Sequence, residues 1–153
     1  MSIESRLAEL GIALPQAAAP VAAYVPAVEV NGLLHISGQI SFAEDGSLIK
    51  GRLGEGLELD DGIAAARRCG IMLLAQIKAA LGSLDRVERI VKLGVFVNSH
   101  GDFTDQPKVA NGASELMQDV FGDAGKHARA AVGVAALPLG VAVEVDAIVA
   151  LRS

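Results

Sequence analysis

The sequence contains few aromatic residues, a single cysteine and no excess of positive charge. Phe, Tyr and Trp together make up 3% of its 153 residues, and the formal net charge is −5. One cysteine excludes a disulfide within the chain and fits a reducing compartment. An acidic chain with few aromatic side chains lacks the general features of a protein that binds nucleic acid or an anionic membrane. We therefore expect a soluble, cytoplasmic protein with no nucleic-acid or membrane partner.

Long uninterrupted apolar runs are also missing. Three prolines interrupt the apolar residues 12–28, so this stretch does not predict a transmembrane helix, which needs about 20 apolar residues. The N-terminus has no basic region followed by an apolar one, and therefore does not resemble a targeting segment. His35, His100 and His127 fall in three different predicted elements without ligand spacing. We predict no metal site.

Apolar residues nevertheless make up 52% of the chain, and many of them are Ala or Val. This composition predicts one domain over residues 1–153 with an aliphatic core. The hydrophobic periodicity and the turn residues predict the following elements: a helix at 2–10 capped by Ser2, an extended segment to residue 20, a hairpin around Asn31-Gly32, a helix from Asp60 or Asp61 to Leu81, a strand at 89–98, a helix at 109–121, and a final strand pair. The order predicts an α+β fold, with two helices on one face of a mixed sheet. The uncovered face keeps apolar residues, which predicts a homo-oligomer.

The final strand pair, residues 127–151, carries the most informative charges. It reads as two strands joined by a Pro138-Leu139-Gly140 turn, and odd positions from 141 to 151 are apolar. Because side chains alternate across a strand, Glu144 and Asp146 are expected on the face opposite the core. We expect Arg129 on that same face, with Val132 on the core face. The simpler interpretation is a surface ion pair; the alternative is an arginine that binds a ligand carboxylate through two parallel hydrogen bonds.

Two other features favour structural roles. Cys69 lies inside the predicted long helix, where a buried thiol is a small apolar side chain more often than a nucleophile. The glycine-rich residues 51–56 do not follow a clear strand and open a helix, so they do not indicate a nucleotide site. His127 lies two residues before Arg129, and either borders a pocket there or is a polar loop residue.

Several short motifs, spread from about Pro20 to Arg152, together form a specific pattern. They are Tyr24-Val-Pro, His35-Ile-Ser-Gly-Gln-Ile40, Phe96-Val-Asn98 followed by Phe103 and Asn111, Arg129-Ala-Ala-Val-Gly-Val134, Leu137-Pro138, and Val143-Glu-Val-Asp-Ala-Ile148. This pattern resembles the RidA (YjgF) family of reactive-intermediate deaminases, also called L-PSP endoribonuclease-like proteins. The resemblance implies a chorismate-mutase-like α+β fold, a homotrimer with sites between subunits, and cofactor-free hydrolysis of enamines or imines, such as 2-aminoacrylate, to 2-keto acids and ammonia.

The resemblance also implies roles for individual residues. Arg129 matches the arginine that binds the substrate carboxylate, and Asp146 falls where the family has a glutamate associated with the reacting water. The substrate-binding positions are Tyr24, Ser37, Gly38, Asn111, Ala131 and Glu144.

Several departures from the family pattern leave other functions open. Asp146 is one methylene shorter than glutamate, Ala131 replaces a common cysteine and offers only its backbone N–H, and Ser114 replaces a common aromatic residue. The chain also has an N-terminal helix and a longer 98–108 connection. A module that binds a small carboxylate without turnover is the alternative to a deaminase. A ribonuclease or translation inhibitor, suggested by the family's older name, fits the acidic composition less well.

Overall fold

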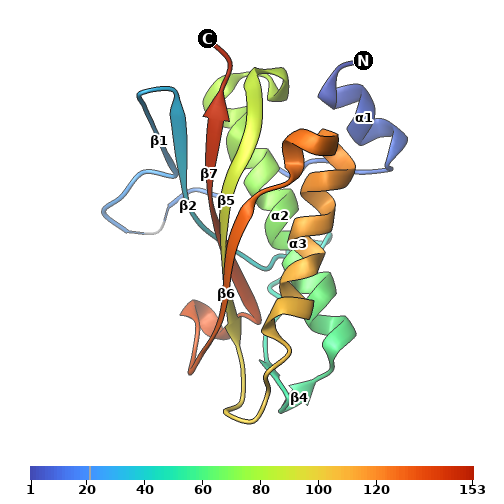
Figure 1. Ribbon diagram of the computed structural model, residues 1–153. Coiled ribbons are helices and arrows are strands. Elements are labelled where there is room, and N and C mark those ends of the chain that lie inside the picture. Colours follow the sequence, from blue (N-terminus) through green and yellow to red (C-terminus); the bar gives the residue numbers. More distant parts are fainter. Residues whose placement is uncertain (21) are drawn as a thin grey trace.

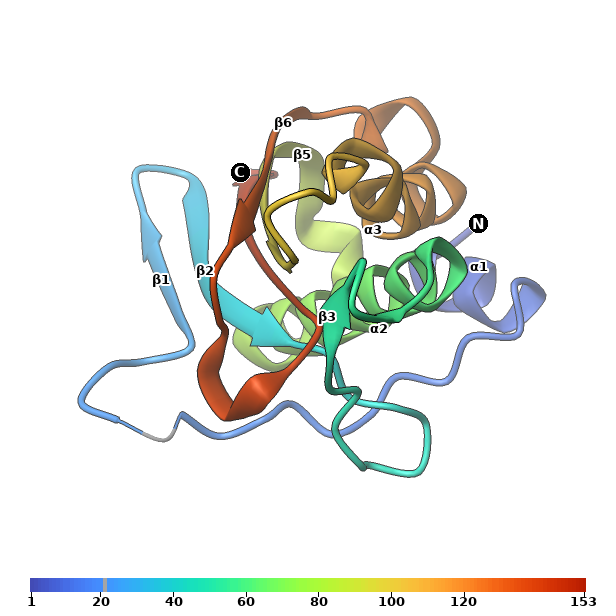
Figure 2. The same cartoon turned by 90° about the horizontal axis from the view of Figure 1, so that it is seen from below.

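Two long helices cover one face of a five-stranded sheet in the computed structural model, which describes residues 1–20 and 22–153 (Figures 1 and 2). The strands of this sheet are β1 (Ala27–Val30), β2 (Leu33–Ile40), β5 (Val87–Asn98), β6 (Ala128–Val134) and β7 (Val143–Leu151). Their order is β1-β2-β7-β5-β6; β5 and β6 are parallel and the other neighbours antiparallel. The helices are α1 (Ile3–Glu9), α2 (Leu59–Leu81) and α3 (Gln106–Phe121), and β3 (Arg52–Leu53) and β4 (Gly56–Leu57) form a small separate sheet. The predicted α+β fold is confirmed.

The ends of α2 follow from local sequence. Its first turn is stabilised by Asp61, whose Oδ2 accepts the backbone N–H of Glu58 at 2.8 Å. The N-cap is therefore Glu58, and the prediction that Asp60 or Asp61 occupies that position is wrong by two or three residues. At the other end Gly82 adopts φ +81°, a conformation that favours glycine and ends the helix as predicted.

Close packing of α3 against α2 depends on Gly112. A Cβ atom at Gly112 would overlap the carbonyl oxygen of Ile63 and would lie 3.1 Å from the backbone N of Arg67. Because these are backbone atoms of α2, no side-chain rotation relieves the overlap. The two helices therefore approach at a distance that only glycine allows at this point.

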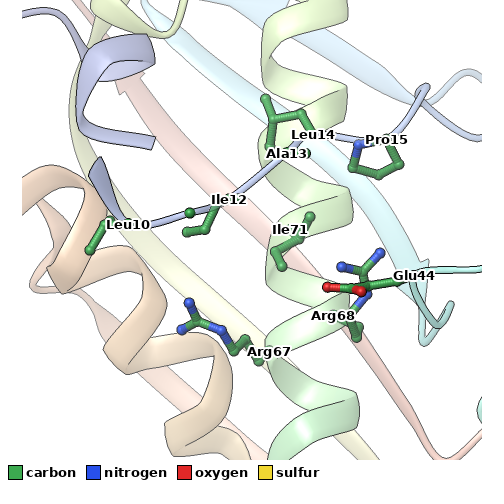
Figure 3. Close-up of a pocket in the computed structure, with 10 residues that line it drawn as sticks. Leu10, Ile12, Ala13, Leu14, Pro15, Glu44, Arg67, Arg68 and Ile71 are labelled. Atoms are coloured by element: carbon green, nitrogen blue, oxygen red, sulfur yellow. The ribbon is translucent and has the colours of Figure 1, made fainter. Parts of the chain in front are cut away.

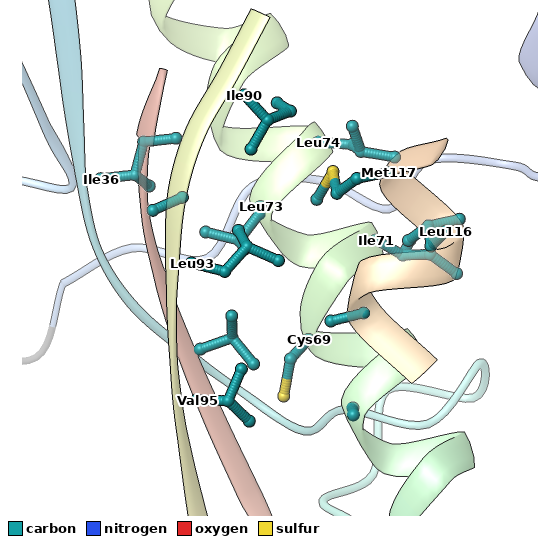
Figure 4. Packing of buried hydrophobic residues seen from close by; sticks show 14 of the residues in the cluster. Ile36, Cys69, Ile71, Leu73, Leu74, Ile90, Leu93, Val95, Leu116 and Met117 are labelled. Atoms are coloured by element: carbon teal, nitrogen blue, oxygen red, sulfur yellow. The ribbon is translucent and has the colours of Figure 1, made fainter. Parts of the chain in front are cut away.

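The core lies between the helices and the sheet, and it is aliphatic as predicted (Figure 4). Leu93 and Val95 of β5 face Leu73 of α2 and Met117 of α3, and all four are at most 1% exposed. The predicted alternation of β7 is confirmed, since each odd residue from 143 to 151 is buried and each even residue only partly so. Cys69 is fully buried, and burial raises the pKa of its thiol well above the usual range. Its predicted role as a small core residue is confirmed.

The N-terminal part of the chain is attached to the domain by specific contacts. The side chain of Ser2 accepts the N–H of Ser5 at 3.1 Å, which confirms it as the cap of α1. Leu7 is buried, and Arg6 Nε donates to the carbonyl of Asp119 at 2.9 Å. We call the extended residues 11–20 the strap; Figure 2 shows it running along the helices toward β1. The predicted hairpin at Asn31-Gly32 is also confirmed, with positive φ at both residues.

The predicted pairing of the last two strands is wrong. The strands β6 and β7 are not neighbours, because β5 lies between them. Arg129 pairs with Leu93 of β5, and paired residues of neighbouring strands point to the same face. Since Leu93 is core, Arg129 lies on the helix side, whereas Glu144 and Asp146 lie on the helix-free side. Val132, expected in the core, lies on the helix-free side and is 47% exposed.

The helix-free face of the sheet carries exposed valines. Val28 and Val30 of β1 and Val132 of β6 are each about half exposed. Val28 and Val30 lie at one edge of this face and Val132 at the opposite edge. Contiguous exposed apolar patches are a common sign of an interface. Among the described residues, no helix is long and apolar enough to cross a membrane.

Candidate functional site

Arg129 is held at the seam between β6 and α3. Its Nη1 donates to Asn111 Oδ1 at 2.8 Å and to Ser114 Oγ at 3.1 Å. Within residues 1–20 and 22–153, both hydrogen bonds of this guanidinium use Nη1. Nε and Nη2 make no hydrogen bond to the described residues, and Arg129 is partly exposed. Ala131 lies two residues further along the same face and is half-buried beside the core.

Ser114 connects Arg129 to His127. The Oγ of Ser114 lies 2.9 Å from His127 Nε2, and His127 Nδ1 lies 2.6 Å from the carbonyl oxygen of Gly125. A carbonyl only accepts, so the Nδ1 carries the proton. The Ser114 oxygen accepts from Arg129 at 3.1 Å, so this one hydroxyl contacts both the guanidinium and the His127 ring. This network fixes the orientation of the guanidinium, and His127 contributes to the site through Ser114.

Four other predicted site residues meet on the opposite side of the sheet. Tyr24, Ser37, Gly38 and Glu144 line one cavity of about 570 Å³. Gly38 on β2 lies directly against the Glu144 carboxylate, and a Cβ atom there would overlap Glu144 Oε2. The Ser37 hydroxyl donates to the carbonyl of Val25 at 2.9 Å, which ties the segment carrying Tyr24 to β2.

Asp146 lies in a different cavity of about 340 Å³, with His35, Lys92 and Phe96 among its lining residues. Its nearest glycine is Gly94 of β5, where a Cβ atom would overlap Asp146 Oδ1. The two acids thus share a face, as predicted, but each has its own cavity and its own facing glycine. Arg129 is not among the residues that line either of these two cavities.

Both carboxyl groups have raised pKa values. Burial raises the pKa of Glu144 above its ordinary range, and the negative charge of Asp146 adds to the effect. Burial also raises the pKa of Asp146, although the Gly94 N–H and the charge of Lys92 partly oppose it. A carboxyl group whose charged form is disfavoured takes up and returns protons more readily near neutral pH.

Comparison with known proteins assigns almost the whole chain to one family. Residues 4–150 match the family described as "YjgF/chorismate_mutase-like, putative endoribonuclease". This chain belongs to the YjgF/RidA family. It is 53% identical to Protein TCP17 of Trypanosoma cruzi over 152 residues, covering 99% of this chain and 95% of that protein.

Other YjgF/RidA relatives include a solved structure and a protein with a named activity. The crystal structure of protein Atu1372 from Agrobacterium tumefaciens, of unknown function, superposes with a TM-score of 0.90. It is 44% identical, and the match covers 98% of this chain and 92% of that one. A 2-iminobutanoate/2-iminopropanoate deaminase of Dermatophagoides farinae is 27% identical, with 92% of this chain and 95% of that protein covered.

The predicted site residues form two groups in this chain. Arg129 and Asn111 lie on the helix side, and Tyr24, Ser37, Gly38 and Glu144 lie on the helix-free side. Among the described residues, no group of three or more His, Cys, Asp or Glu is placed to hold a metal ion.

Sequence reasoning missed a buried amide network beside the Glu144 cavity. Gln76 of α2, 3% exposed, donates from Nε2 to the carbonyl of Ala18 at 2.7 Å and to Gln39 Oε1 at 3.3 Å. The Gln39 Nε2 in turn donates to the carbonyl of Ser37 at 2.9 Å. The network therefore joins the strap to the segment that carries Ser37 and Gly38. Its signal in the sequence is a glutamine within the otherwise apolar residues 69–77.

Proposed function

We propose that this protein is a cofactor-free deaminase that hydrolyses 2-imino acids, and their enamine forms such as 2-aminoacrylate, to 2-keto acids and ammonia. The family membership and the relative named as a 2-iminobutanoate/2-iminopropanoate deaminase support this reaction class. The single observation that carries the proposal is the preorganised Arg129, whose Nε–Nη2 edge is left open by the bonds to Asn111 and Ser114.

Arg129 binds the substrate carboxylate. The planar Nε–Nη2 edge matches the two oxygens of a carboxylate, which accept two parallel hydrogen bonds. Asn111 and Ser114 hold the guanidinium before substrate arrives, so less conformational entropy is lost on binding. The carboxylate anchored in this way fixes the position of the neighbouring imine carbon.

Glu144 is the better candidate for the group that acts on water, in place of Asp146. It shares its cavity with Tyr24 and Ser37, whereas Asp146 does not. Its carboxylate accepts a proton as water adds to the carbon of the protonated imine, giving a carbinolamine. Return of that proton to nitrogen makes the amine a leaving group. As the C–N bond breaks, the hydroxyl oxygen becomes the carbonyl oxygen and its proton passes to Glu144, which transfers it to the departing ammonia and leaves the 2-keto acid. The raised pKa of Glu144 suits both transfers.

A complete site requires two subunits. Arg129 and Glu144 lie on opposite faces of one sheet, so a single chain cannot direct both at one substrate. An interface that joins the Arg129 side of one copy to the Glu144 side of the next is head-to-tail, and such contacts form a closed ring when the rotation between copies completes a full turn. We propose that the ring is the family's homotrimer, and the exposed Val28, Val30 and Val132 supply apolar surface for it.

The test uses an amino-acid oxidase that releases imino acids, with keto acid and ammonia followed over time. We expect wild type to accelerate release, and Arg129→Ala and Glu144→Gln to lose at least tenfold of that acceleration. Arg86→Ala is the matched control, because Arg86 is exposed and makes only a 3.7 Å ion pair with Glu29 among the described residues. Equal activity of wild type and Arg129→Ala refutes the proposed role.

Co-expression of the two inactive variants tests the shared site. In a random mixture, about one interface in four combines an intact Arg129 with an intact Glu144, so about a quarter of the activity returns. No recovery in mixed oligomers, with each variant inactive alone, contradicts a site shared between two subunits.

A carboxylate-binding module is the second candidate. Arg129, Asn111 and Ser114 can bind a carboxylate within one subunit, but they include no acidic side chain to act on water. A chain that stays monomeric would therefore bind the carboxylate without turnover. A monomer in light scattering that binds 2-oxobutyrate in calorimetry and gives no rate supports this function over the deaminase.

A further inference from the structure

A third cavity, lined by charged and apolar residues, lies between the strap and α2. Its volume is about 500 Å³, within the usual range for sites that bind small molecules. One wall is formed by residues 10–15 and the other by Arg67, Arg68 and Ile71 of α2. Figure 3 shows these three α2 side chains projecting on the side along which the strap runs. Arg129, Glu144 and Asp146 do not line this cavity.

The cavity has an excess of positive charge in an otherwise acidic protein. Arg67 and Arg68 line it together with one acid, Glu44, whereas the whole chain carries a net charge of −5. Over residues 1–20 and 22–153, neither arginine has a carboxylate partner within 4.0 Å. Both are only partly exposed, so solvent screens their charges less than on an open surface.

One of the two guanidinium groups is already oriented. Arg68 Nε donates to the carbonyl of Phe42 at 2.8 Å, which holds the group in place and leaves its two Nη atoms toward other partners. Guanidinium groups bind carboxylate and phosphate oxygens with directional hydrogen bonds. The remaining lining is largely apolar, with Ile12 and Leu14 from the strap facing Ile71.

We propose that this cavity binds a small oxyanion, carboxylate or phosphate, carried on an apolar body. The oxyanion contacts Arg67 and Arg68, and the apolar body lies between Ile71 and the strap residues Ile12 and Leu14. The cavity is also linked to the Glu144 cavity. The strap supplies residues 18–20 to that cavity, and Phe42, which accepts from Arg68, lines it as well.

Calorimetry on the Arg129→Ala protein tests the proposal, because this background removes the carboxylate clamp of the proposed deaminase site. The probes are hexanoate, phenyl phosphate and inorganic phosphate. We expect hexanoate or phenyl phosphate to bind at least tenfold more tightly than inorganic phosphate, and binding to weaken as salt is raised. A preference between the two tailed probes identifies the oxyanion. Binding of inorganic phosphate as tight as that of both tailed probes overturns the apolar part of the proposal.

Arg67→Gln in the same background is expected to weaken binding at least tenfold. Arg89→Gln is the matched control: it removes the same charge from an exposed arginine on β5 and should leave the affinity unchanged. Absence of heat with all three probes, or equal affinity in the Arg67→Gln protein, overturns the proposal. Either result leaves the deaminase proposal intact, since that rests on Arg129 and Glu144.

Discussion

Two glycines allow the roles of Glu144 and Asp146 to be separated without changing either acid. Gly38 lies against Glu144 and Gly94 lies against Asp146, each on a neighbouring strand. A Cβ atom at either position would overlap a carboxylate oxygen of the facing acid. Neither glycine has a positive φ, so alanine is compatible with the backbone at both. Gly38→Ala and Gly94→Ala are therefore a matched pair that displaces one acid each.

The expected magnitudes differ between stability and catalysis. The atoms in the way are the ends of flexible side chains, which can rotate, so we expect each variant to lose about 1 kcal/mol or less of unfolding free energy. Displacing a catalytic group by about 1 Å can cost about 100-fold in rate, or roughly 2.7 kcal/mol in activation free energy. We expect Gly38→Ala to lose about 100-fold in kcat and Gly94→Ala to stay within about threefold of wild type.

The assay is the imino-acid hydrolysis described above, with kcat and KM measured separately and thermal unfolding as a check on folding. A displaced Glu144 lowers kcat, whereas a methyl group that only obstructs the cavity raises KM and leaves kcat unchanged. The assignment to Glu144 is refuted if Gly94→Ala loses kcat and Gly38→Ala does not. That outcome would assign the role of acting on the water to Asp146, as the resemblance to the family implies.

Two further predictions concern pH and packing. The raised pKa of Glu144 means that the folded state binds this proton more tightly than the unfolded state, so this group lowers stability as pH rises from the ordinary carboxyl pKa through the raised one. Glu144→Gln should therefore unfold at a higher temperature than wild type at pH 7 and lose this advantage at pH values below the ordinary carboxyl pKa. A Tm difference between the two proteins that does not change with pH would contradict burial of the Glu144 charge as its cause. Gly112→Ala should cost about 3 kcal/mol, a Tm decrease of about 6–12 °C, because the added methyl meets α2 backbone. Gly101→Ala, with nothing within 4 Å of the added methyl, should stay within about 0.5 kcal/mol, and equal Tm values for both variants would contradict the packing argument.

The elements predicted correctly are those specified by neighbouring residues. The helical run of α2, its end at Gly82 and the hairpin at Asn31-Gly32 depend on local periodicity and on backbone conformations that nearby residues set. The alternation of β7 is equally visible, because this strand lies between two others and one of its faces is fully buried.

The face of β6 could not be predicted in the same way. This strand is at the edge of the sheet, and it carries apolar residues on both sides: Val132 is exposed while Ala131 packs toward the core. Its orientation is set by pairing with β5, where Arg129 pairs with Leu93, a residue 36 positions earlier in the sequence. The pattern therefore placed Arg129 beside the acids, whereas the pairing places it beside Asn111 and Ser114 on α3.

The position of β7 has a consequence for how the chain folds during synthesis. It follows all the other strands in the sequence, yet it pairs with both β2 and β5 and occupies the centre of the sheet. The β1–β2 hairpin and the β5–α3–β6 unit therefore emerge from the ribosome before β7. Until then, the edges of β2 and β5 that pair with β7 have no partner strand. Exposed edges of this kind pair readily with other chains. The nascent protein is most exposed to aggregation until Val143–Leu151 emerges and fills the gap, and the same step delivers Glu144 to its cavity.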